Sequence, residues 1–245
     1  MESRTSRRWG GQAVETTVVA SRRLTPQTHG IMVKKPTGFA FRPTQFTFLS
    51  LKTDVGWDVR PMSIATSTTR PSLEYAVRVG DSPFKRAFAS LRPGDTVAVQ
   101  GPFGHFLLEE DRPAVLIAGG IGITPLKGMA EYAADTDLPI QVRLLYSNRT
   151  EEEIAYRAEL EELEKLNPRF RVVYTLTGAR VSRGWKGSVG RISAQLLQDA
   201  GHGLERPAYY VCGMTPMVAE MVGLLSESGV PESDVRLEVF RGYRS

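Results

Sequence analysis

Val115-Leu-Ile-Ala-Gly-Gly-Ile-Gly-Ile-Thr-Pro125 and Tyr209-Tyr-Val-Cys-Gly-Met-Thr-Pro216 follow one pattern: a short apolar strand, a glycine turn, and Thr-Pro at the start of a helix. Threonine is a favourable N-cap, and proline at the first helical position loses no hydrogen bond. Glycine lets a ligand approach the backbone, where the N–H groups of a helix N-terminus attract an anion. Two such turns at the carboxyl edge of one parallel sheet predict a cleft for a nucleotide pyrophosphate.

From Asp111 onward, the chain around these turns alternates between strand and helix patterns. The predicted strands are 114–118, 140–146, 170–176, 208–212 and 235–239, and the predicted helices are 125–134, 151–166, 192–200 and 216–228. This alternation predicts an α/β fold with a doubly wound parallel sheet. The helix at 151–166 would open on Glu151, Glu152 and Glu153, charges that a helix N-terminus favours.

The first half of the chain has a different period, with short alternating runs rich in β-branched and aromatic residues. The predicted strands are 12–22, 29–34, 45–52, 59–66, 72–79 and 95–100, and residues 84–91 have helical spacing. Six short strands at this spacing predict an antiparallel β-barrel of Greek-key type. We therefore predict two domains, the barrel at residues 12–110 and the α/β domain at residues 111–245.

The composition is that of an ordinary globular protein, with 41% hydrophobic and 24% charged residues. The net charge of +4 and the pI of about 9.3 permit an acidic protein partner or an anionic cofactor. Nucleic-acid binding is not predicted, because the arginines do not cluster with aromatic residues on one element. No apolar run approaches the ~20 residues of a membrane span. The first ten residues carry arginines without the apolar stretch of a secretory signal, so we expect a cytoplasmic protein.

The chain has a single cysteine, Cys212, and three histidines, His29, His105 and His202. One cysteine excludes an internal disulfide framework and a four-cysteine iron–sulfur or zinc site. The histidines are scattered without metal-ligand spacing. No metal centre is predicted.

Two segments of the barrel half carry candidate ligand-binding residues. Arg60-Pro-Met-Ser63 places a cation and a hydroxyl three residues apart on one predicted strand. Lys85 opens the short helix, where a cation opposes the helix dipole unless an anion also lies there. A lysine that simply points outward is an equally good interpretation of Lys85.

Taken in order, these segments resemble the ferredoxin–NADP reductase family of flavoproteins, in its bacterial form without an iron–sulfur domain. The resemblance covers nearly the whole chain after residue 12. It rests on Arg60-Pro-Met-Ser63, Gly101-Pro-Phe-Gly104, Gly119-Gly-Ile-Gly-Ile-Thr-Pro125, Tyr210-Val-Cys-Gly213 and Glu238-Val-Phe240. The family implies an FAD-binding barrel followed by an NAD(P)-binding α/β domain, with the flavin at their interface.

For the barrel, the resemblance implies that the segment Arg60-Pro61-Met62-Ser63 binds flavin. Arg60 would bind the flavin diphosphate, and Ser63 would lie near flavin N5. Met62 replaces the tyrosine that normally lies against the flavin ring. A thioether can pack on a ring but offers no hydroxyl. Lys85 stands where the family has a Ser or Thr that binds the diphosphate, and Thr44 replaces a usual glycine.

For the α/β half, the resemblance implies a pyrophosphate turn made by Gly119, Gly120, Gly122, Thr124 and Pro125. It also implies that Cys212, followed by Gly213, lies beside the nicotinamide and orients hydride transfer. The alternative for Cys212 is a small buried core residue. Glu238 and Phe240 share one face of their strand, so both can border one pocket, with Phe240 shielding the flavin until nicotinamide docks.

Two features beyond these motifs concern nucleotide binding. The tail Arg241–Ser245 follows the Glu-Val-Phe motif, and Tyr243 could stack on adenine or flavin, or belong to a frayed terminus. Arg180 and Arg183, with Arg149, follow strands that should end near the adenosine ribose. Since no acidic residue accompanies them, they favour NADPH slightly over NADH.

The resemblance implies a cytoplasmic oxidoreductase that moves a hydride from NAD(P)H to FAD and then passes electrons to an acceptor. A separate ferredoxin or flavodoxin fits the missing cysteines and the basic charge balance. One alternative is a reductase of free flavin or ferric chelates. The other is a flavin-binding electron-transfer subunit that acts within a larger complex.

Overall fold

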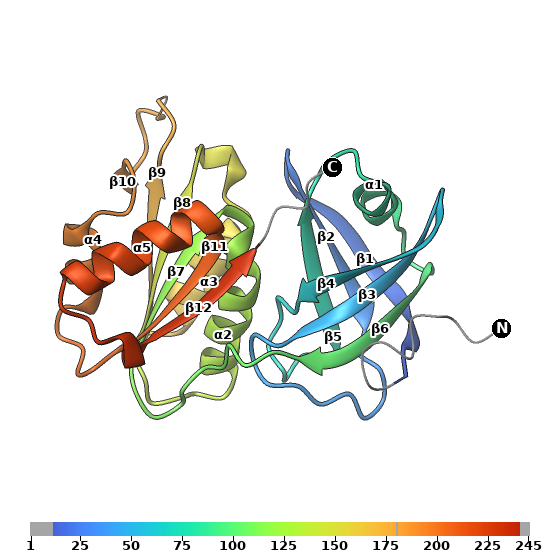
Figure 1. Cartoon of the computed structure of the whole chain (residues 1–245), viewed down its shortest axis with the longest axis horizontal. Coiled ribbons are helices and arrows are strands. Elements are labelled where there is room, and N and C mark those ends of the chain that lie inside the picture. Colours follow the sequence, from blue (N-terminus) through green and yellow to red (C-terminus); the bar gives the residue numbers. More distant parts are fainter. Residues whose placement is uncertain (1–11, 180, 241–245) are drawn as a thin grey trace.

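The computed structural model describes residues 12–179 and 181–240. It contains two six-stranded sheets in separate lobes (Figure 1), the first antiparallel and the second parallel. The predicted fold, a barrel followed by a doubly wound α/β domain, is confirmed. The predicted boundary between residues 110 and 111 falls in the connection between the two sheets and stays a prediction.

The first sheet curls into a half-barrel around its own core. Its strands are β1 (Val14–Thr25), β2 (Thr28–Lys34), β3 (Phe46–Thr53), β4 (Gly56–Ser63), β5 (Ser72–Arg78) and β6 (Thr96–Phe103), in the order β4-β3-β6-β1-β2-β5. The edge strands β4 and β5 approach each other without forming a ladder. Helix α1 (Pro83–Ser90) inserts Phe84 and Phe88 into this core, because the two rings stand four residues apart on one helix face.

The second sheet carries helices on both faces. Its strands are β7 (Ala114–Gly119), β8 (Val142–Asn148), β9 (Phe170–Leu176), β10 (Ser188–Val189), β11 (Ala208–Met214) and β12 (Val235–Phe240), in the order β10-β9-β8-β7-β11-β12. Helices α2 (Ile123–Asp135) and α3 (Arg157–Leu166) pack on one face, and α4 (Ala194–Gly201) and α5 (Thr215–Glu227) on the other. Within the described ranges, no helix has the length and apolar character required to cross a bilayer.

Two elements differ from the prediction. The predicted helix at 151–166 is wrong in its first turns: Glu151–Glu153 form a short 3-10 turn, and α3 begins only at Arg157. Tyr156, with φ of +62°, separates them in a left-handed conformation while its ring is buried. Burial of this ring overrides the helical pattern of the glutamates. The two-residue strand β10 is too short for its alternation to be recognised.

Thr44 occupies a backbone conformation that glycine favours. Residues Arg42–Gln45 form a turn closed by a 3.2 Å hydrogen bond from Gln45 N to Arg42 O, with Pro43 second and Thr44 third. The φ of Thr44 is +76°. Proline second and positive φ third are typical of a type II turn, whose third residue is normally glycine. The usual glycine of the family at this position therefore has a local physical reason.

We expect Thr44→Gly to stabilise the protein by about 0.5–1 kcal/mol in urea unfolding. It relieves about 1–2 kcal/mol of left-handed strain, which exceeds the roughly 0.5–1 kcal/mol of added glycine entropy. The neighbouring turn Pro36–Phe39 supplies the control, because Gly38 already holds its positive φ of 75°. Thr37→Gly in that turn should destabilise, and an equal loss at Thr44 would contradict the assignment of strain.

Candidate active site

The structure brings the two glycine turns into contact at the carboxyl edge of the parallel sheet. Strands β7 and β11 are paired, with Ala118 opposite Cys212. A Cβ at Gly122 would lie only 2.3 Å from the carbonyl oxygen of Cys212 and 2.9 Å from Gly213 Cα. Gly122 therefore lets the backbones of the two turns touch. The predicted nucleotide cleft at this edge stays a prediction.

The predicted role of threonine as N-cap is wrong at both turns. The first turn continues through a 3-10 turn at Gly120–Gly122, so α2 begins at Ile123 and Thr124 is its second residue. Thr124 Oγ1 instead donates to Ile121 O at 3.1 Å. At α5, Thr215 is the first helical residue. The actual N-caps, Gly122 and Met214, make no side-chain capping hydrogen bond, which leaves both helix N-termini suited to an anionic ligand.

The glycines of the two turns differ in what surrounds their missing side chains. Gly120 has φ of +51°, and the position of its missing Cβ has no atom within 4 Å, so its backbone faces open space. A Cβ at Gly119 or Gly213 would lie 3.2 Å or 2.9 Å from Met217 Sδ. The flexible Met217 side chain therefore lies over the surface between the turns. An open, positive-φ glycine beside a helix N-terminus fits a pyrophosphate.

Cys212 and Glu238 are directly opposite each other on β11 and β12. Burial raises the pKa of the Cys212 thiol well above its ordinary value, and the nearby Glu238 carboxylate raises this pKa further. The thiol is therefore neutral, which argues against a nucleophilic role. Glu238 and Phe240 are both half-buried on the same face of β12, as predicted, whereas Leu237 and Val239 are exposed.

Glu238→Gln should change how stability depends on pH. Burial raises the pKa of the Glu238 carboxyl above its ordinary value of 4.5. The folded protein then holds this proton more tightly than the unfolded chain. Glu238 therefore contributes stability below pH 4.5, which is lost as the pH rises through the raised pKa.

Melting temperatures of wild type and Glu238→Gln, measured over a pH series, test this. The wild type should lose more stability than the variant as the pH rises from 4.5. Glu227→Gln, at the exposed end of α5, is the matched control and should follow the wild type. Parallel curves for wild type and Glu238→Gln would show that Glu238 does not titrate abnormally.

A cleft next to the turns contains residues that sequence reasoning missed. It is lined by Ser147 at the end of β8, Thr177 after β9, Pro216 at the start of α5, and the pair Arg191 and Glu220. Arg191 Nη1 lies 2.9 Å from Glu220 Oε2. No motif could reveal this pair, because its members are 29 residues apart and meet only when α5 packs on the sheet.

The arginines predicted to favour NADPH lie elsewhere. Arg149 and Arg183 are exposed and do not line this cleft. Arg180 lies outside the described residues. The cation that the structure does place in the cleft is Arg191, which follows β10.

On the barrel side, Arg60 lies close to the start of α1. Its guanidinium pairs with Asp58, and its Cζ lies 5.6 Å from the centre of the Phe84 ring. The N-cap of α1 is Ser82, whose Oγ accepts from Lys85 N at 3.4 Å, so Lys85 is the third helical residue. A cation on β4 beside a helix N-terminus suits a diphosphate.

The remaining flavin-motif residues alternate on β4. Met62 is buried within the barrel core, Pro61 is exposed, and Ser63 is half-buried at the end of the strand. The structure therefore places the Met62 thioether mainly against other core side chains. Contacts of Met62, Ser63 and Lys85 with flavin stay predictions. Tyr243 lies outside the described residues.

Comparisons with known proteins agree with this geometry. Residues 116–222 match the family model described as the oxidoreductase NAD-binding domain. The chain is 30% identical to ferredoxin–NADP reductase B of Sorangium cellulosum, over 91% of this chain and 96% of that protein. It is 28% identical to a glycine betaine monooxygenase reductase subunit of Chromohalobacter salexigens, over 87% of this chain and 60% of that protein.

A solved structure gives the same fold. The ferredoxin NADP⁺ reductase of Neisseria gonorrhoeae, determined with bound FAD and NADP, superposes with a TM-score of 0.78 at 22% identity, covering 96% of this chain and all of that one. The sequence relationship to the Sorangium protein extends along both lobes. The chain therefore belongs to the ferredoxin–NADP reductase family and is an FAD-dependent NAD(P)H reductase.

Proposed function

We propose that this reductase takes its hydride from NADPH in preference to NADH and delivers electrons to a separate acceptor protein of the ferredoxin or flavodoxin type. The observation that carries the hydride step is the contact of the two glycine turns beside the buried Cys212 and its half-buried neighbour Glu238. The printed names of the two relatives support the acceptor: one is a ferredoxin–NADP reductase, and the other is the reductase subunit of a monooxygenase.

The chain supplies position and electrostatics for this step. The N-termini of α2 and α5, with Gly120, hold the dinucleotide pyrophosphate. The neutral thiol of Cys212 would pack beside the nicotinamide without reacting, and Phe240, two residues after Glu238, would cover the flavin ring. Ser63 presents a hydroxyl to the acceptor atom of the flavin. When bound, FAD supplies the chemistry by accepting a hydride and releasing electrons singly or in pairs.

The preference for NADPH has one argument in its favour. Arg191 lies in the cleft next to the turns, and its partner Glu220 is a surface residue at 2.9 Å. An exposed ion pair is weak, so a 2′-phosphate could compete with Glu220 for the guanidinium. Glu220 would be the residue that limits this preference, because a carboxylate repels a phosphate and can bind the 2′-hydroxyl of NADH.

An anaerobic titration of the FAD-loaded protein, first with NADPH and separately with NADH, tests the donor. Preferential bleaching of the flavin absorbance by NADPH is expected, and equal or stronger bleaching by NADH would contradict the preference. The reduced protein is then mixed with a [2Fe–2S] ferredoxin, a flavodoxin, free FMN or ferric citrate. Reoxidation by FMN or ferric citrate but by neither protein would favour the free-flavin or ferric-chelate reductase instead.

A further inference from the structure

Helix α2 packs unusually closely against the backbone that follows the Arg60–Ser63 motif. A Cβ at Gly128 would lie 3.1 Å from the carbonyl oxygen of Ile64 and 3.2 Å from that of Thr66. These contacts join the two lobes, because α2 belongs to the parallel sheet and residues 64–66 leave strand β4 of the barrel. The absence of a side chain at Gly128 sets the distance between them. We refer to this contact surface as the seam.

Lys127, next to Gly128, is the centre of a buried ionic cluster at the seam. Its side chain is 3% exposed, and its Nζ donates to Ala65 O at 3.1 Å. The same ammonium lies 3.2 Å from Glu74 Oε2 on β5 and 2.6 Å from Glu131 Oε1, one turn further along α2. Glu131 also accepts from Ser67 N at 3.1 Å. Two charged side chains of α2 thus hold the backbone that extends from β4.

The cluster reaches further into both lobes. Arg22 on β1 lies 3.0 Å from Glu74 and 2.6 Å from Glu159 of α3. The buried ring of Tyr156 lies beneath both cations, 4.8 Å from Lys127 Nζ and 5.9 Å from Arg22 Cζ. The left-handed backbone of Tyr156 turns this ring inward. Strained residues of this kind persist where the surrounding structure holds them in place.

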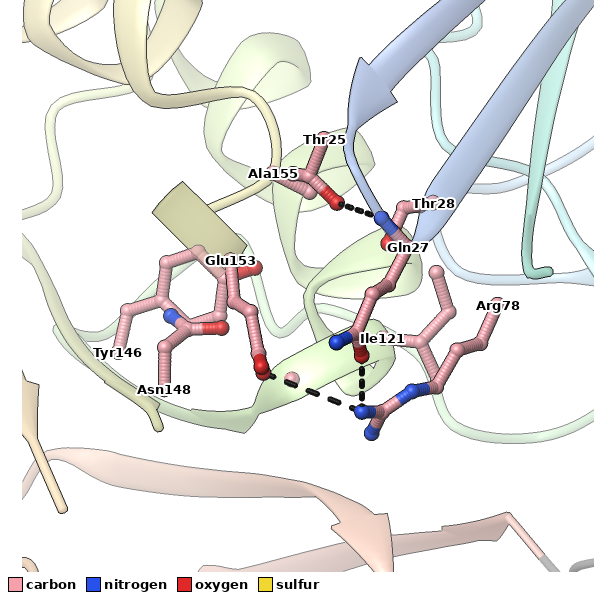
Figure 2. Close-up of a pocket in the computed structure, with 10 residues that line it drawn as sticks. Thr25, Gln27, Thr28, Arg78, Ile121, Tyr146, Asn148, Glu153 and Ala155 are labelled. Carbon is pink, nitrogen blue, oxygen red and sulfur yellow. Dashed lines mark hydrogen bonds and ion pairs between the residues drawn. The ribbon is translucent and has the colours of Figure 1, made fainter. Parts of the chain in front are cut away.

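The rim of the seam is looser. Arg70, 51% exposed, pairs with Asp135 at 2.7 Å. Outside the seam, at another contact between the lobes, Figure 2 shows Arg78 of β5 pointing toward Gln27 and, at 4.0 Å, toward Glu153. The cavity there is about 20 Å³, which is room for one water molecule. A cavity of this size cannot hold a cofactor. The buried ion pair that the structure describes between the lobes is that of Lys127 with Glu74.

The position of Lys127 along the chain links this cluster to hydride transfer. It lies about one turn after Ile123, where α2 begins at the pyrophosphate turn. Its acceptor Ala65 lies two residues after Ser63, at the end of the flavin-binding strand. A single ammonium thus connects the segment expected to hold the nucleotide with the segment expected to hold the flavin.

We propose that Lys127 is a positioning residue for hydride transfer: with Glu74, Glu131 and Gly128, it fixes the distance between the nicotinamide and the flavin. This rests on the proposed function. A charge buried at the seam resists sliding, because movement would leave it without partners in a medium where an unpaired charge is very costly. Effective hydride transfer needs the reacting atoms held about 3–3.5 Å apart.

Lys127→Met keeps most of the unbranched side chain but removes the ammonium. It should slow flavin reduction by saturating NADPH by about 10- to 100-fold, since a displacement near 1 Å can cost that much. The rate is measured by stopped-flow absorbance per mole of bound FAD. Reduction of the same samples by dithionite needs no nucleotide and should be unchanged. The charge-transfer absorbance of the complex with nucleotide should also weaken, whereas a merely structural role would lower FAD content without altering these per-flavin values.

Gly128→Ala tests the same seam without changing any charge. Its Cβ would push on two backbone carbonyls, so it should slow reduction by NADPH and spare reduction by dithionite. This variant also decides the question if Lys127→Met does not fold. Gly223→Ala, in α5 with no atom within 4 Å of its Cβ position, is the steric control. Asp135→Asn removes the charge of the Arg70–Asp135 pair at the rim and keeps an amide oxygen that can still accept from the Thr69 hydroxyl, so it is the electrostatic control. Both controls should retain the wild-type rate.

The outcomes separate the two proposals. A wild type reduced by neither nucleotide overturns the proposed function and the role of Lys127 with it. If NADPH reduces the wild type, and reduces Gly128→Ala and any folded Lys127→Met at the same rate, only the positioning role is overturned. Equal slowing in Asp135→Asn would also overturn it, because the effect would then belong to any ion pair between the lobes.

Discussion

Gly122→Ala should abolish flavin reduction by NAD(P)H and lower the free energy of unfolding by about 3 kcal/mol, at the upper end of the usual cost of overpacking. The new methyl carbon would lie 2.3 Å from the Cys212 carbonyl oxygen and 2.6 Å from its carbonyl carbon. These are backbone atoms of β11, which is hydrogen-bonded on both sides to β7 and β12. Neither turn can yield without breaking the paired edge at which we expect the nucleotide to bind.

Gly120→Ala is the comparison for this variant, because it lies in the same turn but has open space around its Cβ position. Its positive φ of 51° should cost only about 1–2 kcal/mol. Urea unfolding gives the stability of both variants, and stopped-flow absorbance gives their rate of reduction. A Gly122→Ala protein as stable as Gly120→Ala would mean that the two turns do not touch as described.

Arg60→Ala should raise the dissociation constant of FAD by about 10- to 100-fold, which corresponds to the roughly 1.5–3 kcal/mol of a hydrogen bond to a charged group. The guanidinium lies between Asp58 and the Phe84 ring at the start of α1. Removing it takes away the cation and leaves Asp58 to repel the diphosphate. Affinity is measured by titrating flavin-depleted protein with FAD and following fluorescence quenching.

Two further variants separate these contributions. Asp58→Asn/Arg60→Ala removes the repulsion and should recover part of the lost affinity. Arg86→Ala, within α1, breaks an exposed 2.7 Å pair with Asp54 and should bind FAD like the wild type. If Arg60→Ala binds FAD with the affinity of the wild type, Arg60 does not belong to the flavin site. The N-terminus of α1 would then be the main element that binds the diphosphate.

Local patterns were sufficient for most of the fold. The change from a period of two to alternating strands and helices predicted both sheets, and the apolar runs before the glycine turns predicted the strands β7 and β11. Such patterns are reliable because a strand or an amphipathic helix buries one face wherever it packs. The likeness of the two glycine turns also predicted that they would lie at one sheet edge.

The same local reasoning failed where contacts with residues far away in the sequence determine the backbone conformation. Tyr156 interrupts the predicted helix because its ring is buried beside Lys127 and Arg22. The threonines of the two turns are not N-caps, since the backbone of the first turn tightens into a 3-10 turn before α2. Thr44 keeps a positive φ that its sequence does not favour.

The sequence by itself determined the two lobes, their order and the position of the nucleotide turns. Only the tertiary structure decided how the lobes are joined. Glu74 and Lys127 are 53 residues apart in the chain, and Arg191 and Glu220 are 29 apart. No spacing rule connects such residues, because their meeting depends on how whole elements pack. A buried charge, however, needs a partner of opposite charge, and this requirement fixes how the two lobes pack against each other, which local sequence patterns do not determine.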